Sequence, residues 1–377
     1  MKIGIDTFGC DHGRSGLGSY LLSLVPNLPL SNPDIQYNLF GSEMDRYTYS
    51  SDKGFAFSSI NVPDSLFAER FWHRFMVNSF AKKQGYDVVL YTAGARMLPN
   101  SFKVPGVAVI NDIMSMLISE ADDFFTKFQM KKSLSACKTI IATSKFIKHD
   151  LENLGISEKK IEVIYNGIDH TLFFPKEHIG LENEAIDIKP FAIKRPYLVY
   201  ASRMQNESKK HIELIKAFTL FKERTHLPHR LVIAGSESLY GEQVHKAAFA
   251  SSAASDIFIT GYFPHEHFPE LYRNADACIF PSIKEGVGLP VLEAMATGLP
   301  VACSDSGALP EITGENALLF DSSSPESISS AIEKIVCNAD LRKKLIEDGL
   351  EWSKRFSWEK TCKQTLKILL SAAEAKK

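Results

Sequence analysis

The sequence has no long apolar run and no excess of charge of either sign. No stretch approaches the ~20 consecutive apolar residues that a membrane-spanning helix requires, so we expect no transmembrane segment. Lysine and arginine (43) nearly balance aspartate and glutamate (45), which leaves a net charge of −2. Proteins that bind nucleic acid neutralise its phosphates with a strongly basic surface. The charge balance therefore argues against nucleic acid as a partner.

The cysteines and histidines are not arranged in metal-binding patterns. The six cysteines form no Cys-x-x-Cys pair, and His12, His73 and His211 lack the spacing of metal ligands. We therefore predict no metal site, and we expect reduced cysteines in the core of a cytoplasmic protein. The first nine residues (MKIGIDTFG) predict a strand, because their apolar stretch is too short for a signal peptide.

The length and the hydrophobic pattern indicate an α/β protein with more than one domain. A chain of 377 residues is too long for one ordinary core, and a composition of 45% hydrophobic and 23% charged residues is that of a globular protein. Short apolar runs alternate with amphipathic segments of helical period, which predicts two doubly wound parallel sheets. Strands are expected at residues 2–6, 36–40, 87–91, 107–110 and 139–143, and at 196–202, 229–235, 257–261, 277–280 and 300–304.

The predicted organisation is an N-terminal domain over 1–172, a linker over 173–195 and a C-terminal domain over 196–356. The linker region carries prolines and many charges and has no clear hydrophobic period. The end of the chain, from residue 340, is helical by pattern, and RFSW (355–358) can interrupt it. We therefore expect a separate last helix over about 357–377.

The most informative stretch is PSIKEGVGLPVLEAMATG, at residues 281–298. The apolar run ACIF before it predicts a buried strand, and Pro290 suits the first turn of a helix because its missing N–H costs nothing there. Between strand and helix lies a glycine loop, whose N–H groups can hold a phosphate or a sugar hydroxyl at the positive end of the helix dipole. We place Glu293 in the first turn, where its carboxylate can accept hydrogen bonds from ribose hydroxyls or simply stabilise the helix.

The order Pro-Ser, Glu-Gly, Gly-Leu-Pro and Leu-Glu-Ala-Met resembles the nucleotide-sugar signature of retaining family-4 glycosyltransferases of the GT-B fold. Val287 departs from that signature, which usually has phenylalanine at this position. The resemblance covers nearly the full chain. It implies two Rossmann-like domains facing across a cleft, the second for the nucleotide sugar and the first for the acceptor, with the last helix packed back on the first domain. Domain closure would exclude water from the reactive donor.

The resemblance also implies roles for residues of the second domain. Glu285 would accept hydrogen bonds from hydroxyls of the donor sugar, and Glu293 would accept from the ribose. The backbone groups expected to bind sugar and phosphate are those of Gly286, Val287, Gly288 and Leu289.

Two cations follow a predicted strand in YASRMQNESKK, at residues 200–210. Arg203 lies just past the strand, and Lys209 follows it in a spacing that resembles the family. Carboxyl ends of parallel strands border the ligand crevice, where two cations can stabilise a departing diphosphate without a metal ion. The alternative is a pair of solvated side chains. Lys210 stands where the family usually has glycine or asparagine, so it either adds positive charge to the site or points away.

A glycine-rich loop, FGCDHGRSGLGSY (8–20), follows the first predicted strand. Gly16 and Gly18 permit close approach of the backbone to a ligand at a helix N-terminus. The loop resembles the one that reaches the donor diphosphate from the first domain of the family. Arg14 is either a phosphate or acceptor contact or a solvated loop residue.

Asn111 and Asp112 end a buried strand in VAVINDIMSM, at residues 107–116. The family commonly has His-Asp here, and that histidine contacts the transferred sugar. Asn111 can still hydrogen-bond a sugar hydroxyl, but it cannot titrate, so we exclude an acid or base at this position. Asp112 is a candidate catalytic residue, with a helix cap as the alternative. The later Asn166–Gly167 turn follows a strand-like run, IEVI (161–164), and resembles the segment that closes the first domain.

Members of the family transfer the sugar with retention at the anomeric carbon. The sequence offers no convincing nucleophile for a covalent intermediate, so we favour front-face displacement in which the departing phosphate takes the acceptor proton. No two aspartates are separated by one residue, so the acidic motif that holds a divalent ion in the other major glycosyltransferase fold is absent. We therefore expect a metal-independent enzyme that needs no cofactor besides its nucleotide-sugar substrate.

The overall pattern is most similar to bacterial polysaccharide mannosyltransferases. This resemblance implies GDP-mannose as donor and a saccharide or lipid-linked saccharide as acceptor, in polysaccharide or glycan biosynthesis. A UDP-sugar-dependent glucosyl- or N-acetylglucosaminyltransferase is the alternative within the fold. A non-catalytic nucleotide-sugar-binding protein and a nucleotide-sugar epimerase are alternatives from other classes. An oxidoreductase would require the full dinucleotide fingerprint, which is lacking.

Residues 69–87 form an amphipathic pattern in which Phe71, Trp72, Phe75 and Phe80 alternate with arginine and lysine. We interpret this segment as a core helix packed on the sheet. The alternative is a helix that lies on a membrane surface. Such a helix would allow peripheral association with the inner face of a membrane.

Overall fold

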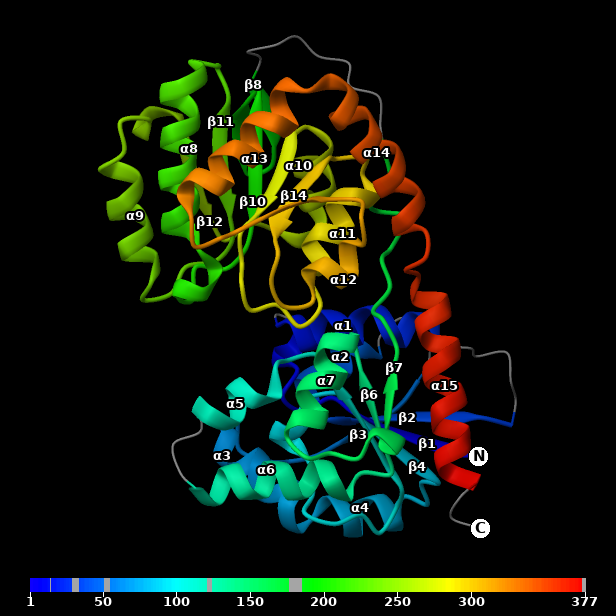
Figure 1. Cartoon of the computed structure of the whole chain (residues 1–377). Coiled ribbons are helices and arrows are strands. Elements are labelled where there is room, and N and C mark those ends of the chain that lie inside the picture. Colours follow the sequence, from blue (N-terminus) through cyan, green and yellow to red (C-terminus); the bar gives the residue numbers. More distant parts are fainter. Residues whose placement is uncertain (14, 29–33, 51–54, 121–123, 176–184, 375–377) are drawn as a thin grey trace. The chain divides into compact units, whose positions relative to one another are not determined.

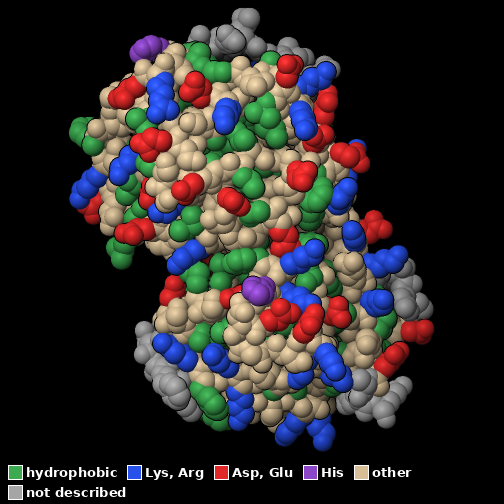
Figure 2. All heavy atoms as spheres, in the orientation of Figure 1, with side chains coloured by type: hydrophobic (Ala, Val, Ile, Leu, Met, Phe, Trp, Pro, Cys, Tyr) green, Lys and Arg blue, Asp and Glu red, His purple; other side chains and the backbone are tan. Residues whose placement is uncertain are grey.

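The computed structural model describes residues 1–13, 15–28, 34–50, 55–120, 124–175 and 185–374 (Figure 1). Two compact units make up the chain. The first consists of Met1–Gly167 and Phe356–Lys377, and the second of Ile168–Arg355. Each unit is a twisted parallel sheet covered by helices. Figure 2 shows basic side chains interspersed with acidic ones over the face in view, in keeping with the net charge of −2.

The sheet of the first unit has seven strands, all parallel, in the order β3-β2-β1-β4-β5-β6-β7. All five strands predicted for this part are present. Strand β7 corresponds to the strand-like run at 161–164. The edge strand β3 was not predicted, because AFSS carries little of the apolar signal of a buried strand. The strands are β1 (Lys2–Asp6), β2 (Gln36–Gly41), β3 (Ala56–Ser59), β4 (Val88–Tyr91), β5 (Gly106–Ile110), β6 (Thr139–Ala142) and β7 (Ile161–Val163).

Helices cover both faces of this sheet, so successive side chains along each strand point alternately into two hydrophobic cores. Val88 and Leu90 of β4 belong to the core under α1 and α15, whereas Val89 and Tyr91 belong to the core under α3, α4, α6 and α7. The helices are α1 (Gly16–Leu24), α2 (Glu43–Tyr49), α3 (Leu66–Phe75), α4 (Val77–Lys83), α5 (Met114–Glu120), α6 (Phe124–Ala136), α7 (Lys145–Asn153) and α15 (Trp358–Glu374).

The last helix, α15, belongs to the first unit although it comes from the end of the chain. The Trp358 ring meets Tyr20 of α1 at 5.5 Å between centroids. The Thr361 hydroxyl donates to the Tyr165 carbonyl at 2.7 Å. Gly167 is required here, since a Cβ atom on it would lie 2.1 Å from the Trp358 backbone nitrogen. The Asn-Gly turn thus provides the close approach that seats α15.

The sheet of the second unit has six parallel strands in the order β12-β11-β10-β13-β14-β15. All five strands predicted for this part are present. The strands are β10 (Tyr197–Ala201), β11 (Arg230–Ala234), β12 (Ile257–Gly261), β13 (Ala277–Phe280), β14 (Val301–Ser304) and β15 (Leu318–Phe320). The helices are α8 (His211–Thr225), α9 (Gly241–Phe249), α10 (Phe268–Arg273), α11 (Leu289–Ala296), α12 (Leu309–Thr313), α13 (Pro325–Cys337) and α14 (Ala339–Ser353).

Part of the segment interpreted as a linker has regular structure. Strands β8 (Ala185–Ile188) and β9 (Phe191–Lys194) form an antiparallel hairpin that belongs to the second unit. Ile188 and Ile193 are buried, and the Phe191 ring stacks on Phe263 at 5.7 Å. The hairpin was not predicted, because the many charged residues around it obscured its short alternation of apolar and polar residues. Residues 176–184 of the predicted linker lie outside the described residues.

The interpretation of residues 69–87 as one core helix is correct for Trp72 and wrong for Phe71 and Phe75. The segment forms two helices, α3 and α4, joined at Met76. Trp72 is buried, whereas the side chains of Phe71 and Phe75 are exposed. The pattern predicted an amphipathic helix, but aromatic residues occur on both of its faces, so the pattern alone did not identify the buried one.

Five of the six cysteines are buried, and all six are free thiols. Cys337 is the exposed exception at the end of α13. The described part of the chain contains no helix that is long and apolar enough to cross a membrane.

Candidate functional site

The strand order of the second unit reverses at β10, which pairs with β11 on one side and β13 on the other. In open parallel sheets, ligands bind outside the carboxyl ends of the strands at such a reversal. The segments that leave β10 and β13 carry the predicted residues Lys209 and Glu285. The Lys209 Nζ atom donates to Glu285 Oε1 at 2.6 Å, and the two side chains are 18% and 16% exposed. The structure therefore brings these two residues together at the expected edge.

Backbone hydrogen bonds fix this pair in place. The Ile283 N–H donates to the Ser208 carbonyl at 2.9 Å, which joins the two loops. The buried Tyr200 hydroxyl donates to the Lys209 carbonyl at 2.7 Å. The Glu285 carbonyl accepts from the Ala308 N–H at 2.9 Å. Lys209 and Glu285 are thus held by three different loops at one end of the sheet.

Lys210 is the residue that departs from the family pattern, and the structure explains why glycine or asparagine suits this position. Its backbone is left-handed, with φ 56° and ψ 31°. Glycine adopts this conformation freely, whereas lysine adopts it at a cost. The Lys210 Nζ atom pairs with Glu213 at 2.7 Å. Its charge therefore goes to the surface of α8 and not to the Lys209–Glu285 pair.

The predicted glycine loop and helix are present after β13. Gly288 is left-handed, with φ 76°, and caps α11, with Pro290 in the first turn. A Cβ atom on Gly288 would lie 2.7 Å from Leu309 Cδ2, so any other residue would also have to displace the end of that side chain. The first N–H groups of a helix lack partners within the helix. The loop from Gly286 to Leu289 thus leads directly into a helix N-terminus that can hold an anion.

The prediction that Glu293 lies in the first turn of α11 is wrong. The helix starts at Leu289, so Glu293 is its fifth residue and lies in the second turn. Its side chain is 15% exposed, and His265 Nε2 lies 3.9 Å from Glu293 Oε1. Burial raises the pKa of Glu293 to about 7. The buried carboxyl group therefore keeps its proton to a higher pH than an exposed glutamate does.

Arg203 lies two residues beyond β10 and is exposed. The chain beyond it runs parallel to the segment after β11, through a bridge between Met204 and Glu237. This bridge directs the backbone at Arg203 along the edge of the sheet. Arg203 thus shares the β10 loop with Lys209.

In the first unit, the glycine-rich loop follows β1, where the strand order also reverses. Gly16 begins α1 and is exposed, and a Cβ atom on it would meet nothing within 4 Å. Gly18 makes close contacts within the chain itself. A Cβ atom on it would lie 2.3 Å from the Cys10 carbonyl oxygen, and its N–H donates to the Ser15 hydroxyl. Gly18 therefore lets the loop pack on α1, and Gly16 leaves open space. Arg14 lies outside the described residues.

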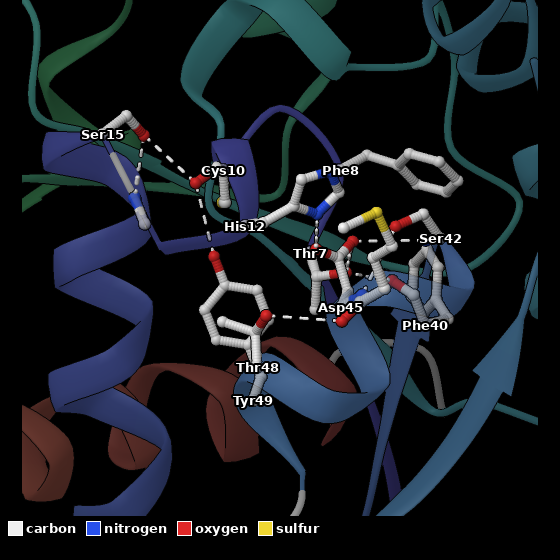
Figure 3. A network of polar contacts seen from close by, with 12 residues as sticks. Thr7, Phe8, Cys10, His12, Ser15, Phe40, Ser42, Asp45, Thr48 and Tyr49 are labelled. Atoms are coloured by element: carbon white, nitrogen blue, oxygen red, sulfur yellow. Dashed lines mark hydrogen bonds and ion pairs between the residues drawn. The ribbon is translucent and has the colours of Figure 1, made fainter. Parts of the chain in front are cut away.

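A buried carboxylate holds a histidine of this loop, as Figure 3 shows. His12 Nδ1 lies 2.7 Å from Asp45 Oδ1, and the two side chains are 26% and 3% exposed. The Thr7 hydroxyl and the Ser42 N–H donate to the other oxygen of Asp45. Because Asp45 is an acceptor, Nδ1 of a neutral His12 carries the proton and Nε2 is left as an acceptor.

The backbone around His12 is strained. Asp11 and His12 have φ 50° and 48°, and Gly13 follows with φ 87°. Left-handed backbone is uncommon outside glycine and costs free energy, and strained residues of this kind cluster at functional sites. Neither His12 nor Asp45 was predicted as a site residue. A polar residue in a glycine loop after the first strand was the available signal, but its partner lies 33 residues away in sequence.

A second histidine–carboxylate pair is fully buried beneath this network. His73 Nε2 lies 2.8 Å from Asp6 Oδ2, and each side chain is 1% exposed. His73 Nδ1 lies 2.7 Å from the Glu69 carbonyl of its own helix. Although burial opposes charge on the imidazole, the Asp6 carboxylate raises the pKa of His73. The pair joins α3 to the end of β1.

Asn111 and Asp112 follow β5 but make separate contacts. The Asn166 side chain donates to Asn111 Oδ1 at 3.1 Å. The Nδ2 atom of Asn111 is buried and has no hydrogen-bond partner among the described residues. Asp112 Oδ2 lies 3.6 Å from Arg96 Nη2, and the two side chains are about 40% exposed (44% and 39%). The structure therefore links Asn111 to the Asn166–Gly167 turn and leaves Asp112 in a surface ion pair.

Comparison with known proteins accounts for most of the chain. The model described as "Glycosyltransferase Family 4" matches residues 19–172, and the one described as "Glycosyl transferases group 1" matches residues 182–352. This chain belongs to the family-4 glycosyltransferases. Their GT-B fold, two Rossmann-like parallel-sheet domains, was the prediction from the sequence, and it is confirmed.

Individual relatives of this family-4 glycosyltransferase are distant. O-antigen chain mannosyltransferase B of Escherichia coli is 33% identical over 171 residues, which is 45% of this chain and 44% of that relative. Sucrose-phosphate synthase from Thermosynechococcus elongatus superposes with a TM-score of 0.77 at 18% identity and covers 100% of both chains. Anabaena HepE in complex with UDP-glucose has a TM-score of 0.75 at 18% identity, over 98% of this chain and 100% of that one.

The described ranges include all of the acidic residues of the predicted site. Within these ranges, no group of three or more His, Cys, Asp or Glu side chains is arranged to hold a metal ion. The predicted site contributes four charged residues to the segments that follow β10 and β13: Arg203, Lys209, Glu285 and Glu293.

Proposed function

We propose that this chain is a retaining, metal-independent glycosyltransferase that moves a sugar from a nucleotide-sugar donor to a saccharide or lipid-linked saccharide acceptor. The observation that carries the proposal is the Lys209–Glu285 contact of 2.6 Å at the strand-order reversal of the second unit. A cation and a carboxylate that lie together can bind the two groups on either side of the bond that breaks, the diphosphate and the sugar. The diphosphate needs positive charge, and the sugar hydroxyls need an acceptor.

The proposed donor site consists of groups from three loops of the second unit. Lys209 and Arg203 stabilise the charge that develops on the departing diphosphate, an effect that is strongest in the transition state. Glu285 accepts hydrogen bonds from sugar hydroxyls and fixes the ring. The N–H groups between Gly286 and Leu289 bind sugar and phosphate. Glu293 accepts from the ribose.

The transfer step balances without any further reactant. The bond between the anomeric carbon and the diphosphate oxygen breaks, and the acceptor oxygen bonds to the same carbon on the same face. The proton of the acceptor hydroxyl passes to the departing phosphate oxygen, which is the nearest base in a front-face displacement. A trapped glycosyl-enzyme adduct would contradict this mechanism.

The first unit supplies the proposed acceptor groups. His12 presents Nε2 as a hydrogen-bond acceptor, because Asp45 fixes Nδ1. A second hydroxyl of the acceptor, other than the one that attacks, can donate to Nε2 and so orient the acceptor. Gly16 leaves open space at the start of α1. Gly16 and Gly18 are proposed to let the glycine-rich loop approach the donor phosphates as well. Asn111 is proposed to bind the donor sugar, and Asp112 is a proposed catalytic residue.

GDP-mannose is the proposed donor, because the 33% identical relative is named a mannosyltransferase. A UDP-sugar is the second candidate, because a protein of the same fold was solved with UDP-glucose. Proposed acceptors are saccharides or lipid-linked saccharides of polysaccharide or glycan biosynthesis.

Thermal unfolding with GDP-mannose, UDP-glucose, UDP-N-acetylglucosamine and the free nucleotides tests the proposal. A ligand present at about 100 times its Kd stabilises the folded chain by about 2.7 kcal/mol. We expect one base family to raise the Tm and Glu285→Gln to reduce the gain from the sugar nucleotide more than that from the free nucleotide. Stabilisation without slow donor hydrolysis or transfer would favour a binding protein.

A further inference from the structure

Helix α3 has a stripe of exposed phenylalanines. Phe67, Phe71 and Phe75 follow one another at four-residue spacing, which places them on one face of the helix. They are 81%, 51% and 59% exposed, and the Phe71 and Phe75 rings lie 4.7 Å apart. Leu66 and Met76, at the two ends of the helix, are also exposed. A contiguous apolar surface of this kind on a folded domain marks an interaction site.

The opposite face of α3 is fixed in the core, so the stripe cannot turn inward. His73 pairs with Asp6 in the fully buried contact of 2.8 Å. The Trp72 ring packs on Phe8 at 5.3 Å and on Phe40 at 6.2 Å. Rotation of the helix would expose this buried pair and remove the Trp72 contacts. Trp72 and His73 occupy the inward-facing side of α3, so the phenylalanines remain on its outer face.

Cations flank the stripe. Arg70 and Arg74 lie on the same side of the helix as the phenylalanines, and the Arg74 guanidinium lies 5.8 Å from the Phe75 ring centre. Lys82 and Lys83, on the following helix α4, are exposed as well. On and beside α3, the acidic residues are Glu69, which is half-buried, and Asp64, which precedes the helix. The outer face is therefore aromatic and positively charged.

We propose that the outer face of α3 docks this protein on an anionic membrane surface. Aromatic rings enter the boundary between headgroups and acyl chains, while arginine and lysine remain at the level of the phosphates. A second copy of this chain fits the face less well. A symmetric dimer through it would bring the positively charged faces, with Arg70 and Arg74, against each other.

The inference rests on the proposed function in one respect, because a lipid-linked acceptor gives the docking its purpose. The docking itself needs neither donor nor acceptor. It can therefore be measured separately from any activity.

Co-sedimentation of the full chain with vesicles tests the proposal. The probes are vesicles of phosphatidylcholine alone and of phosphatidylcholine with one third phosphatidylglycerol. We expect at least tenfold stronger binding to the anionic vesicles, since each cation near such a surface strengthens binding by about fivefold. Phe67→Ser with Phe71→Ser should lower that binding by about tenfold or more. Equal binding to both vesicle types would overturn the anionic assignment.

The matched control is Phe249→Ser. Phe249 is 89% exposed on α9 of the second unit, so the substitution removes an equally exposed ring elsewhere. An equal loss of vesicle binding in this variant would overturn the proposal. The α3 variant should keep the Tm of the parent protein, because its substituted side chains are exposed. A parent that is dimeric on a sizing column and a monomeric α3 variant would assign the face to a second copy instead.

A second measurement does not depend on loss of binding. In Phe71→Trp, insertion of the new indole into anionic vesicles should shift its emission to the blue and allow quenching by brominated acyl chains. An unshifted, unquenched signal would contradict docking through α3. Donor-induced stabilisation of the same variants reports separately on the proposed function. Failure of that stabilisation with vesicle binding intact would reject the function and leave the docking inference standing.

Discussion

Lys209 Nζ and Glu285 Oε1 lie 2.6 Å apart, although the two residues are separated by 76 positions in the sequence. The contact joins the loop after β10 to the loop after β13, the two loops that flank the strand-order reversal. Each side chain is mostly buried, so each charge stabilises the other in the absence of ligand. In the proposed complex, the donor diphosphate would pair with Lys209 and the sugar hydroxyls would donate to Glu285, in place of the contact between the two residues.

We predict that Glu285→Gln and Lys209→Met each lower transfer by about 10²- to 10³-fold, because each removes an electrostatic contact in the transition state. Each substitution should also destabilise the free protein by about 1–3 kcal/mol, since it leaves a charge or donor without its partner. Activity assays and urea unfolding measure the two effects.

The double variant Lys209→Met with Glu285→Gln distinguishes a coupled pair from two independent residues. Its loss of stability should be smaller than the sum of the single losses, because no charge is left unpaired. Strictly additive losses would show that the contact contributes nothing to folding. Lys210→Met is the control for charge removal in the same loop, because Lys210 pairs with Glu213 instead.

Glu293 gives a prediction about pH. Its folded-state pKa is raised from 4.5 to about 7, so between these values the folded protein keeps a proton that the unfolded chain has lost. Stability must therefore fall as pH rises through this window, by up to about 3 kcal/mol for this one group. Glu293→Gln removes the effect. We expect the variant to match the parent near pH 5 and to have the higher Tm at pH 8.

Thermal unfolding of both proteins from pH 5 to pH 8 checks this prediction. A difference in Tm that does not change with pH would contradict the raised pKa. Glu311→Gln is a useful control, since Glu311 lies in the first turn of the neighbouring helix α12. Donor-induced stabilisation of Glu293→Gln should be lower than that of the parent at pH 8, where the parent carboxylate is ionised.

The backbone of Lys210 gives a prediction about stability alone. Lys210→Gly and Lys210→Ala both remove the ion pair with Glu213. At φ 56°, alanine keeps the cost of a left-handed backbone and glycine does not. We expect the glycine variant to be more stable than the alanine variant by about 1 kcal/mol in urea unfolding. Equal stabilities would contradict the left-handed assignment.

Much of the fold could be predicted because parallel strands buried on both faces are short apolar runs. All of the strands predicted for the two main sheets are present. Strand β3 and the β8–β9 hairpin were missed because polar residues interrupt their patterns, and β15 was missed because its apolar run, LLF, is only three residues long. The glycine loop before α11 was also predictable from local sequence, since Gly288 can adopt the left-handed backbone of the N-cap and Pro290 suits the first turn of a helix.

Contacts between distant segments could not be predicted in this way. Nothing in the sequence near His12 indicates that Asp45, from the next helix, would hold its imidazole. Nor did the pattern of α3 show which aromatic residues are buried, because the choice depends on the Asp6–His73 pair. Glu293 was placed one turn too early because the sequence marks the helix start only by Gly288 and Pro290.

His12 gives the last prediction. If its Nε2 atom accepts from a second, non-attacking hydroxyl of the acceptor, His12→Ala should lower transfer by about tenfold, the value of one hydrogen bond of about 1.4 kcal/mol. Donor-induced stabilisation should be unchanged, because the charged side chains proposed to bind the donor belong to the second unit and the glycine loop is proposed to approach the donor through its backbone. His12→Gln, which offers an amide oxygen, should recover part of the activity. The matched control is His149→Ala, since His149 also lies near a carboxylate, Glu152, at 3.8 Å, but is 73% exposed. Loss of donor-induced stabilisation in His12→Ala would contradict an acceptor role, as would equal loss of transfer in the control.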